Sequence, residues 1–188
     1  RQNAQKLSTS DWIFMLDADE EISDDLQQSI KKIIHKEPKI YQVNRLSKAF
    51  GTEVKYSGWF PDWINRIYPN NLTTYNDALV HETLIIPENH DPVKISGILY
   101  HETYKNMKDY YQKMSLYIDA WSTQNVNKKN GGLFIGIIRG YWAFIKMYFF
   151  KLGFLDGSVG FTLALLRYET TVMKYVDLKI KKEINKTN

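Results

Sequence analysis

The 188-residue sequence contains no cysteine, which excludes a disulfide framework and a thiolate metal site and agrees with a reducing compartment. It shows no signal-peptide pattern and no nucleic-acid-binding motif. It also lacks an uninterrupted apolar run long enough to cross a bilayer, because Arg139 and Lys146 divide the longest one. These absences exclude a small secreted scaffold and make a clean transmembrane span an unfavourable interpretation.

Aromatic residues are plentiful, with 13 Tyr and 5 Trp, and a chain of this length can bury a core of one domain with a helical appendage. The net charge of +4 is unevenly distributed. From Asn130 onward nine Lys and Arg face four acids, a net of +5, so the preceding part carries −1. This basic excess predicts an anionic partner surface, and a lipid headgroup layer suits it better than nucleic acid.

An apolar run, Trp12–Leu16, ends abruptly at four carboxylates, those of Asp17, Asp19, Glu20 and Glu21. This pattern is typical of a strand buried on both faces that ends at a ligand crevice. Alternation predicts that Asp17 and Asp19 point the same way and share one hard cation. The alternative is that the acids begin a helix.

A helix does begin nearby, since Ser23 followed by Asp24 and Asp25 is typical of an N-terminal cap with favourable charges. That interpretation accounts for Asp24 and Asp25 but leaves Asp17 and Asp19 unexplained.

The remaining periodicities predict further elements of an α/β chain. We expect a helix over 23–36, a half-buried strand over 40–46, a hairpin over 48–57 turning at Gly51, a strand within 58–69, strands over 80–87 and 93–100, and a helix from Asn106 to a boundary at 128–132.

The sequence Asp-Trp-Ile-Phe-Met-Leu-Asp-Ala-Asp-Glu resembles the metal-binding motif of family 2 glycosyltransferases, nucleotide-sugar enzymes of GT-A fold. The rest of the chain is similar to the bacterial branch that builds lipopolysaccharide or lipooligosaccharide cores. The resemblance implies the C-terminal part of a GT-A domain, with a Rossmann-like mixed sheet, over residues 1–104. A helical region that associates with membranes follows over residues 105–188.

The chain starts at Arg1 rather than Met, within an expected helix. In the family, the strands that bind the nucleotide precede the Asp-x-Asp strand. We therefore expect a piece that lacks this N-terminal part and is inactive alone.

The resemblance also implies roles for single residues. Asp17 and Asp19 hold Mg²⁺ or Mn²⁺ against the donor diphosphate, and His101 completes the metal site, with His81 as the competing ligand. Glu82 is the expected catalytic base, because a carboxylate shielded from water suits proton removal, and Asp62 is the second choice. The alternatives are ordinary ones: a strand carboxylate is usually solvated or ion-paired, and a strand-end histidine usually bonds a carbonyl.

Trp59, Trp63 and Arg66 are expected to shape the sugar and phosphate pocket. Aromatic rings stack on pyranose faces, and a guanidinium suits phosphate. The tryptophans can equally fill the core, and Arg66 can equally brace a neighbouring carboxylate.

The C-terminal helices carry the membrane prediction. In Leu133–Phe150, Arg139 and Lys146 share one face and aromatic residues occupy the other, which is typical of a helix lying in the membrane interface. A second helix is expected over about 159–176, before a basic tail. Gly132, Gly136 and Gly140 are spaced by four and allow close approach of another helix. The alternative is a helical pair packed on the catalytic domain or in a dimer.

Together these features predict a metal-dependent inverting glycosyltransferase. The family resemblance implies that it moves a sugar, with glucose expected, from a nucleotide sugar such as UDP-glucose to a lipopolysaccharide-core or other glycolipid acceptor. We expect it on the inner face of the bacterial cytoplasmic membrane, peripheral and facing the cytoplasm, with no nucleic-acid partner. The rival interpretations are a non-catalytic membrane-associated module and a nucleotidyltransferase-like diphosphate enzyme.

Overall fold

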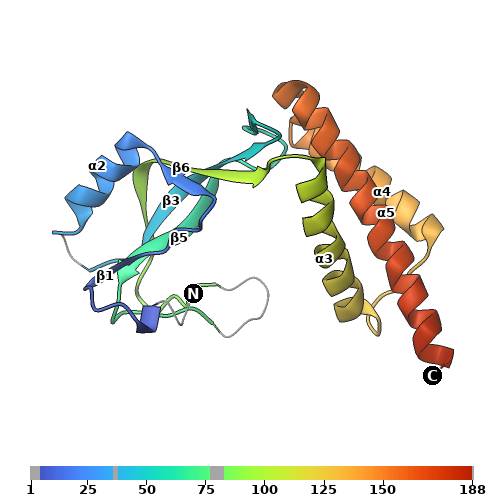
Figure 1. Ribbon diagram of the computed structural model, residues 1–188, viewed down its shortest axis with the longest axis horizontal. Helices are drawn as coiled ribbons and strands as arrows, with labels where there is room; N and C mark the ends of the chain where they lie inside the picture. Colours follow the sequence, from blue (N-terminus) through green and yellow to red (C-terminus); the bar gives the residue numbers. More distant parts are fainter. Residues whose placement is uncertain (1–4, 36–37, 77–82, 188) are drawn as a thin grey trace. The chain divides into compact units, whose positions relative to one another are not determined.

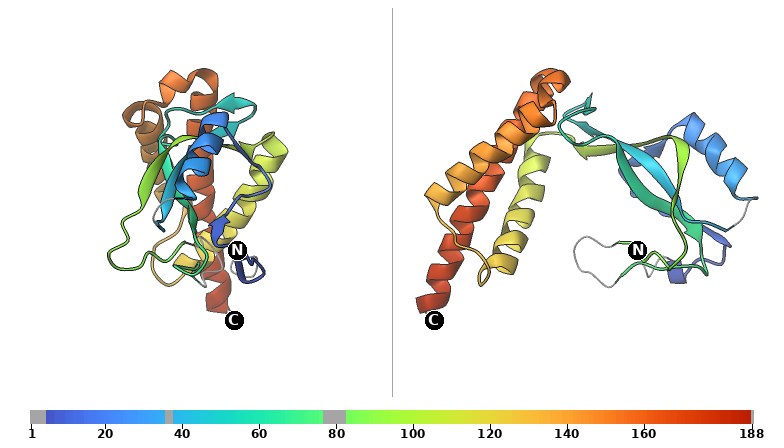
Figure 2. Two further views of the ribbon diagram at one scale, coloured as in Figure 1. Left: turned by 90° about the vertical axis from the view of Figure 1, so that its left-hand side faces the viewer. Right: turned by 180° about the vertical axis from the view of Figure 1, so that it is seen from behind.

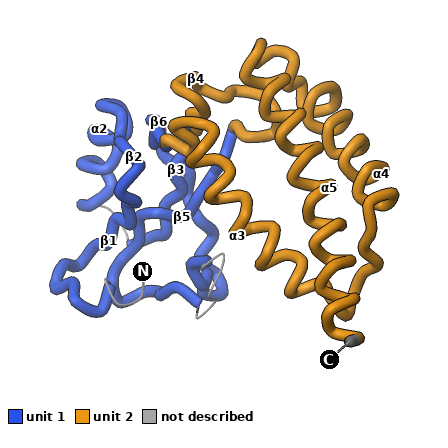
Figure 3. The backbone as a smooth tube through the Cα atoms, turned by 45° about the vertical axis from the view of Figure 1, so that its right-hand side comes forward, with its two compact units in different colours: residues 1–46, 61–101 blue, residues 47–60, 102–188 orange. Residues whose placement is uncertain are grey.

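The computed structural model describes residues 5–35, 38–76 and 83–187 and confirms the α/β class, with a mixed sheet followed by helices (Figure 1). The chain forms two compact units (Figure 3). Unit 1 comprises residues 1–46 and 61–101, and unit 2 comprises residues 47–60 and 102–188. The domain boundary expected between residues 104 and 105 stays a prediction.

The sheet has the strand order β1-β5-β3-β6-β2, and β4 pairs with β3. The strands are β1 (Trp12–Phe14), β2 (Glu20–Ile22), β3 (Tyr41–Ala49), β4 (Thr52–Glu53), β5 (Asp62–Pro69) and β6 (Val93–Tyr104). The pairs β1–β5, β3–β5, β3–β4 and β2–β6 are antiparallel. Backbone hydrogen bonds link the start of β6 to the start of β3 (Val93 to Ile40) and the end of β6 to the end of β3 (Phe50 to Tyr104). β3 and β6 are therefore parallel.

β1 corrects one expectation. It has only three residues, and within the described part of the chain it lies at the end of the strand order and pairs with β5 alone. Ile13 is its one buried residue. The prediction of a central strand over this run was wrong for the described residues, because an apolar run reports burial but not the number of neighbouring strands.

Helix α2 (Asp24–Ile33) covers one face of the sheet in unit 1 (Figure 2). Ser23 is its N-cap, as predicted, and its Oγ accepts hydrogen bonds from Leu26 N and Ile98 N at 3.2 and 2.9 Å. A Cβ on Gly97, whose φ is +103°, would lie 2.2 Å from Leu26 N. Glycine at this position therefore lets the helix start against β6. The core beneath consists of Leu26, Ile33, Tyr41, Val43, Ile67, Ile95 and Leu99.

The β3–β4 hairpin turns as predicted, with positive φ at Phe50 and Gly51 (54° and 77°). The strand expected over 80–87 falls partly on residues 77–82, which lie outside the described ones. Over 83–87 the structure has a single antiparallel bridge, between Tyr75 and Leu84, in place of a strand.

Unit 2 is mainly helical: α3 (Met107–Asn125), α4 (Leu133–Ile145), a π-helix (Lys146–Phe150), a 3₁₀ turn (Gly153–Asp156) and α5 (Gly157–Thr187). α5 continues through the segment expected to be a basic tail. Lys181 and Asp177 form an i,i+4 ion pair at 3.2 Å, and Leu178 is fully buried. Charge pairing and a buried apolar position support the additional turns.

Two of the three spaced glycines lie where α4 packs on α5. A Cβ on Gly136 would lie 2.9 Å from Val172 O, and one on Gly140 would lie 2.9 Å from the Tyr168 ring. A Cβ on Gly132 would meet no atom within 4 Å, whereas one on Gly131 would lie 2.6 Å from Lys179 N. The close approach was predicted correctly for Gly136 and Gly140. Gly132 also lies against α5, since its N–H donates to Tyr175 O at 2.8 Å, although a side chain there would meet no atom.

Candidate functional site

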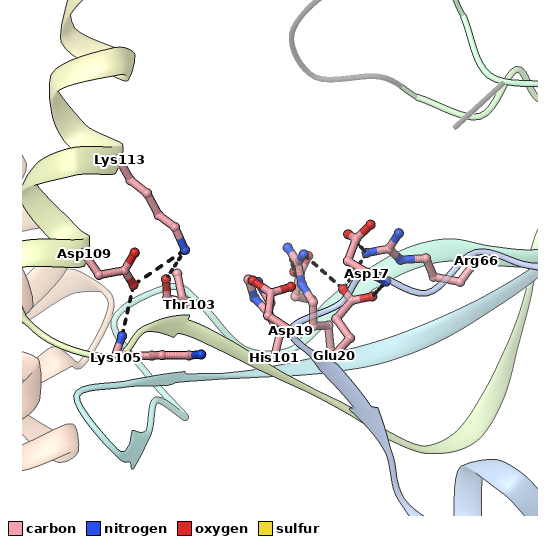
Figure 4. A network of polar contacts seen from close by, with 11 residues as sticks. Asp17, Asp19, Glu20, Arg66, His101, Thr103, Lys105, Asp109 and Lys113 are labelled. Carbon is pink, nitrogen blue, oxygen red and sulfur yellow. Dashed lines mark hydrogen bonds and ion pairs between the residues drawn. The ribbon is translucent and has the colours of Figure 1, made fainter. Parts of the chain in front are cut away.

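The acidic residues lie in the turn between β1 and β2. Met15 N donates to Arg66 O at 2.9 Å, so pairing with β5 continues one residue beyond β1. Glu20 N then donates to Asp17 O at 3.1 Å, which closes the turn. Asp17 and Asp19 project from the same side of the strands as Glu20 and His101 (Figure 4). The turn, rather than a strand end, therefore orients the two aspartates.

Arg66 on β5 joins Asp17 to Glu20. Its Nη2 lies 2.9 Å from Asp17 Oδ2 and 2.5 Å from Glu20 Oε1. Glu20 also accepts a hydrogen bond from the backbone N–H of Asp17 at 3.0 Å. The Glu20 side chain is fully buried, while that of Asp17 is 35% exposed. Glu20 therefore fixes both the turn and the arginine, and leaves part of the Asp17 carboxylate accessible.

The electrostatic surroundings keep Arg66 charged. Burial lowers its pKa, but the hydrogen bond to Asp17 and the negative charges of Glu20 and Asp17 outweigh this, so the pKa is raised above its ordinary value. Its Nε and Nη1 atoms are buried and have no hydrogen-bond partner among the described residues. Buried donors without a partner are costly, and an anionic group is the partner that a guanidinium fork accepts best.

Asp62, the second choice for the base, is paired with Arg45. Its Oδ2 accepts from Arg45 Nε at 2.9 Å and lies 2.7 Å from Arg45 Nη2. Arg45 Nη1 lies 3.8 Å from Glu20 Oε1. Arg45 thus connects Asp62 to the carboxylate that holds Arg66, and one Asp62 oxygen is already engaged.

His101 lies beside Asp19. Its Nε2 is 3.5 Å from Asp19 Oδ2, and the antiparallel register places His101 opposite Glu20. The His101 side chain is 17% exposed and that of Asp19 is 37% exposed. The predicted ligands Asp17, Asp19 and His101 therefore all belong to one group of side chains in unit 1.

The described side chains do not by themselves complete the ligand shell of a hard cation. Over residues 5–35, 38–76 and 83–187, no group of three or more His, Cys, Asp or Glu side chains forms a ready metal site. Mg²⁺ commonly takes one or two carboxylates and completes its shell with water and substrate phosphates. The side chains of Asp17 and Asp19 are 35% and 37% exposed, and a cation site at them stays a prediction.

The two predicted tryptophans have aromatic and cationic neighbours within their own units. Trp63 on β5 has Lys94 Nζ 4.8 Å from its ring centroid. Trp59 belongs to unit 2, where its ring packs on Tyr104 with centroids 6.0 Å apart. Glu82 and His81 lie outside the described residues.

The sequence interpretation missed Glu20 and Arg45. Glu20 was visible as the third acid of the run, but nothing in the sequence distinguishes a buried carboxylate from the exposed Glu21 beside it. Arg45 lies in an alternating strand, where a polar residue is expected to face solvent. Only the sheet register places it opposite Asp62.

Comparison with known proteins gives a similarity to a glycosyltransferase. No protein-family model matches the chain. The chain is 23% identical over 175 residues to an uncharacterized glycosyltransferase of Rickettsia prowazekii (strain Madrid E), an alignment that covers 87% of the chain. The chain spans about 60% of the length of this curated relative. The similarity supports a glycosyltransferase at a coarse level, while family 2 membership and the lipopolysaccharide-core branch stay predictions.

Proposed function

We propose that this chain is part of a metal-dependent inverting glycosyltransferase. It transfers glucose from UDP-glucose to a sugar of a lipopolysaccharide core or similar glycolipid. The observation that carries the proposal is the group of Asp17, Asp19, Glu20, Arg66 and His101, in which buried Glu20 and Arg66 hold the partly exposed Asp17, and His101 lies beside the partly exposed Asp19. The similarity to a glycosyltransferase supports the reaction class.

In this proposal Asp17 and Asp19, with His101 beside them, hold Mg²⁺ or Mn²⁺. Such a cation neutralises the negative charge that develops on a leaving diphosphate. Arg66 orients Asp17, and its unpartnered donors favour an anion in the same place. Glu82 takes the proton of the acceptor hydroxyl. Asp62 stays the second choice, because Arg45 engages one of its oxygens.

We place the enzyme on the inner face of the bacterial cytoplasmic membrane, held there by unit 2. Leu133–Phe150 is long and apolar enough, by length and composition, to cross a membrane, and 17% of it is buried. Its charges Arg139 and Lys146 favour a position in the interface rather than across the bilayer. A lipid-linked acceptor and an enzyme on the same surface then meet in one plane.

The test is transfer of labelled glucose from UDP-glucose to a lipopolysaccharide-core acceptor by the natural protein, as the cell makes it. We expect transfer to require Mg²⁺ or Mn²⁺ and to fall about 100-fold or more in Asp19→Asn. Asp25→Asn, in the first turn of α2, is the matched control and keeps full activity. Full activity in Asp19→Asn, or activity with chelator present, contradicts the metal role. Release of pyrophosphate instead of sugar transfer indicates a nucleotidyltransferase.

A further inference from the structure

Unit 2 contains a cavity of its own, with a volume of about 400 Å³. The β4–β5 loop, the end of β6, α3, α5 and the end of α4 with its π-helix all line it, and every lining residue belongs to unit 2. Ligand pockets for small molecules begin at about 300 Å³, so this cavity suits one monosaccharide-sized group with a small substituent.

One wall of the cavity is held rigidly by Asp156. Its carboxylate accepts hydrogen bonds from the backbone N–H of Lys55 at 2.9 Å and of Tyr56 at 3.0 Å, and from Ser57 Oγ at 2.7 Å. Gly58 follows with φ of +76°, and a Cβ there would lie 3.3 Å from Lys151 Cγ. The loop is therefore fixed by hydrogen bonds before any ligand arrives, which lowers the entropic cost of binding.

Aromatic rings form the inner part of the cavity. Tyr104 packs edge-on against Trp59 and Tyr110, with centroids 6.0 and 5.0 Å away. Tyr110 is fixed by hydrogen bonds of its hydroxyl to Leu166 O at 3.0 Å and to Thr170 Oγ1 at 2.5 Å. Burial raises the pKa of Tyr104 to about 12, so its hydroxyl stays protonated and can donate. Such rings offer apolar faces to the C–H faces of a pyranose.

Three cations line the same cavity, Lys146, Lys151 and Arg167, and all three are exposed to solvent. Among the described residues, no acidic side chain lines it. Among the ion pairs of the described residues, none involves these three side chains. Positive charges without an acidic partner favour an anionic group, and the aromatic surface beside them favours a sugar ring. A ligand that combines the two would use both parts of the cavity.

We propose that this cavity binds a phosphorylated saccharide, with the sugar ring against Trp59 and Tyr104 and the phosphate at Lys146, Lys151 and Arg167. Phosphate matches the guanidinium fork of Arg167 and two point charges of lysine. Its role as the site for the acceptor rests on the proposed glycosyltransferase function, whereas the binding itself does not. The ligand is either a soluble sugar phosphate or the phosphorylated headgroup of a glycolipid.

The first experiment measures binding to the whole chain by isothermal titration calorimetry, using glucose 6-phosphate, glucose and inorganic phosphate. We expect the sugar phosphate to bind about tenfold more tightly than either fragment, because both parts of the cavity are used. Arg167→Gln and Lys146→Gln each weaken this binding about tenfold. Arg139→Gln removes the same charge from an exposed position of α4 outside the cavity and leaves binding unchanged.

The second experiment separates the two sources of the phosphate. Vesicles that contain a phosphorylated glycolipid such as lipid A are compared with vesicles of phosphatidylglycerol at equal charge. Arg139 belongs to the proposed membrane face, so Arg139→Gln should weaken binding to both kinds of vesicle alike. A loss in Arg167→Gln that is larger with lipid A than with phosphatidylglycerol vesicles identifies a glycolipid headgroup, while an Arg167→Gln effect on glucose 6-phosphate alone identifies a soluble ligand.

Equal losses in Arg167→Gln and Arg139→Gln with every ligand overturn the proposal, as does a preference for single-stranded nucleic acid over sugar phosphates. Circular dichroism shows that each variant is folded. We expect Asp19→Asn to abolish transfer but to leave sugar phosphate binding intact. A failure of the proposed reaction can therefore be distinguished from a failure of this binding site.

Discussion

At the scale of single residues, Glu20 determines how the acidic turn is built. Its carboxylate is fully buried and contacts the Arg66 guanidinium and the backbone N–H of Asp17. A buried charge of this kind is tolerated because its partners are fixed, and removal of one partner leaves the other charge uncompensated. The buried Glu20–Arg66 pair therefore fixes the position of the Asp17 carboxylate.

Glu20→Gln tests this arrangement. Loss of the buried negative charge leaves Arg66 with Asp17 alone, and we expect the free energy of unfolding to fall by about 3 kcal/mol. Urea denaturation measures the change. Glu21→Gln is the matched control, because Glu21 is exposed, and its effect should stay within about 0.5 kcal/mol. Equal stability of the two variants would show that the Glu20–Arg66 pair contributes little.

A second prediction at this scale concerns Tyr104 and alkaline pH. Burial raises its pKa from 10.0 to about 12. Because the folded state favours the neutral phenol, its contribution to stability is complete below pH 10 and is lost as pH rises through about 12. Phenolate absorbance should show a component that titrates near the upper value and disappears in Tyr104→Phe. The exposed Tyr141→Phe should leave that component in place.

At the scale of elements, two glycines set the distance between α4 and α5. The Cβ positions of Gly136 and Gly140 face Val172 O and Tyr168 at 2.9 Å, closer than real Cβ atoms approach. Glycine inside a helix normally costs about 1 kcal/mol relative to alanine. Close helix packing offsets this cost, since it brings Val172 and Tyr168 against the α4 backbone.

Gly136→Ala separates helix propensity from packing. Propensity alone predicts stabilisation by about 1 kcal/mol, whereas the clash with Val172 O predicts destabilisation by about 2 kcal/mol. We expect destabilisation, measured by thermal or urea unfolding. Ile138→Ala on the exposed side of α4 should change stability by less than about 0.5 kcal/mol. A more stable Gly136→Ala would mean that α4 and α5 lie further apart.

At the scale of the whole molecule, charge and apolar exposure are concentrated in the C-terminal part. The residues from Asn130 onward carry a net charge of +5, whereas the preceding residues carry −1. The same part exposes Phe134, Trp142, Phe149, Phe150 and Leu155. Aromatic side chains next to lysine and arginine are what the interface of an anionic membrane favours.

Vesicle binding tests this prediction. The chain should co-sediment with vesicles that contain phosphatidylglycerol more than with neutral vesicles, and the binding should weaken as salt increases. Phe150→Ala, which removes a side chain of a 68% exposed residue, should lower the affinity about tenfold. Leu7→Ala, at a residue of unit 1 that is 85% exposed, should have no effect. Binding that is insensitive to lipid charge contradicts the proposal.

The sequence by itself determined the α/β class, the cap at Ser23, the turn at Gly51, the close approach at Gly136 and Gly140, and the acidic residues Asp17 and Asp19. These features depend on contacts over a few residues or on one helix face, and local spacing records such contacts directly.

Only the tertiary structure decided that β1 ends the strand order of the described residues, that Glu20 is buried, and that Arg66 joins Asp17 to Glu20. It also brought Lys146, Lys151 and Arg167 to one cavity with Trp59 and Tyr104. These relations join residues tens of positions apart through strand order and helix packing. Alternation and periodicity describe one element at a time, so they carry no record of which elements become neighbours.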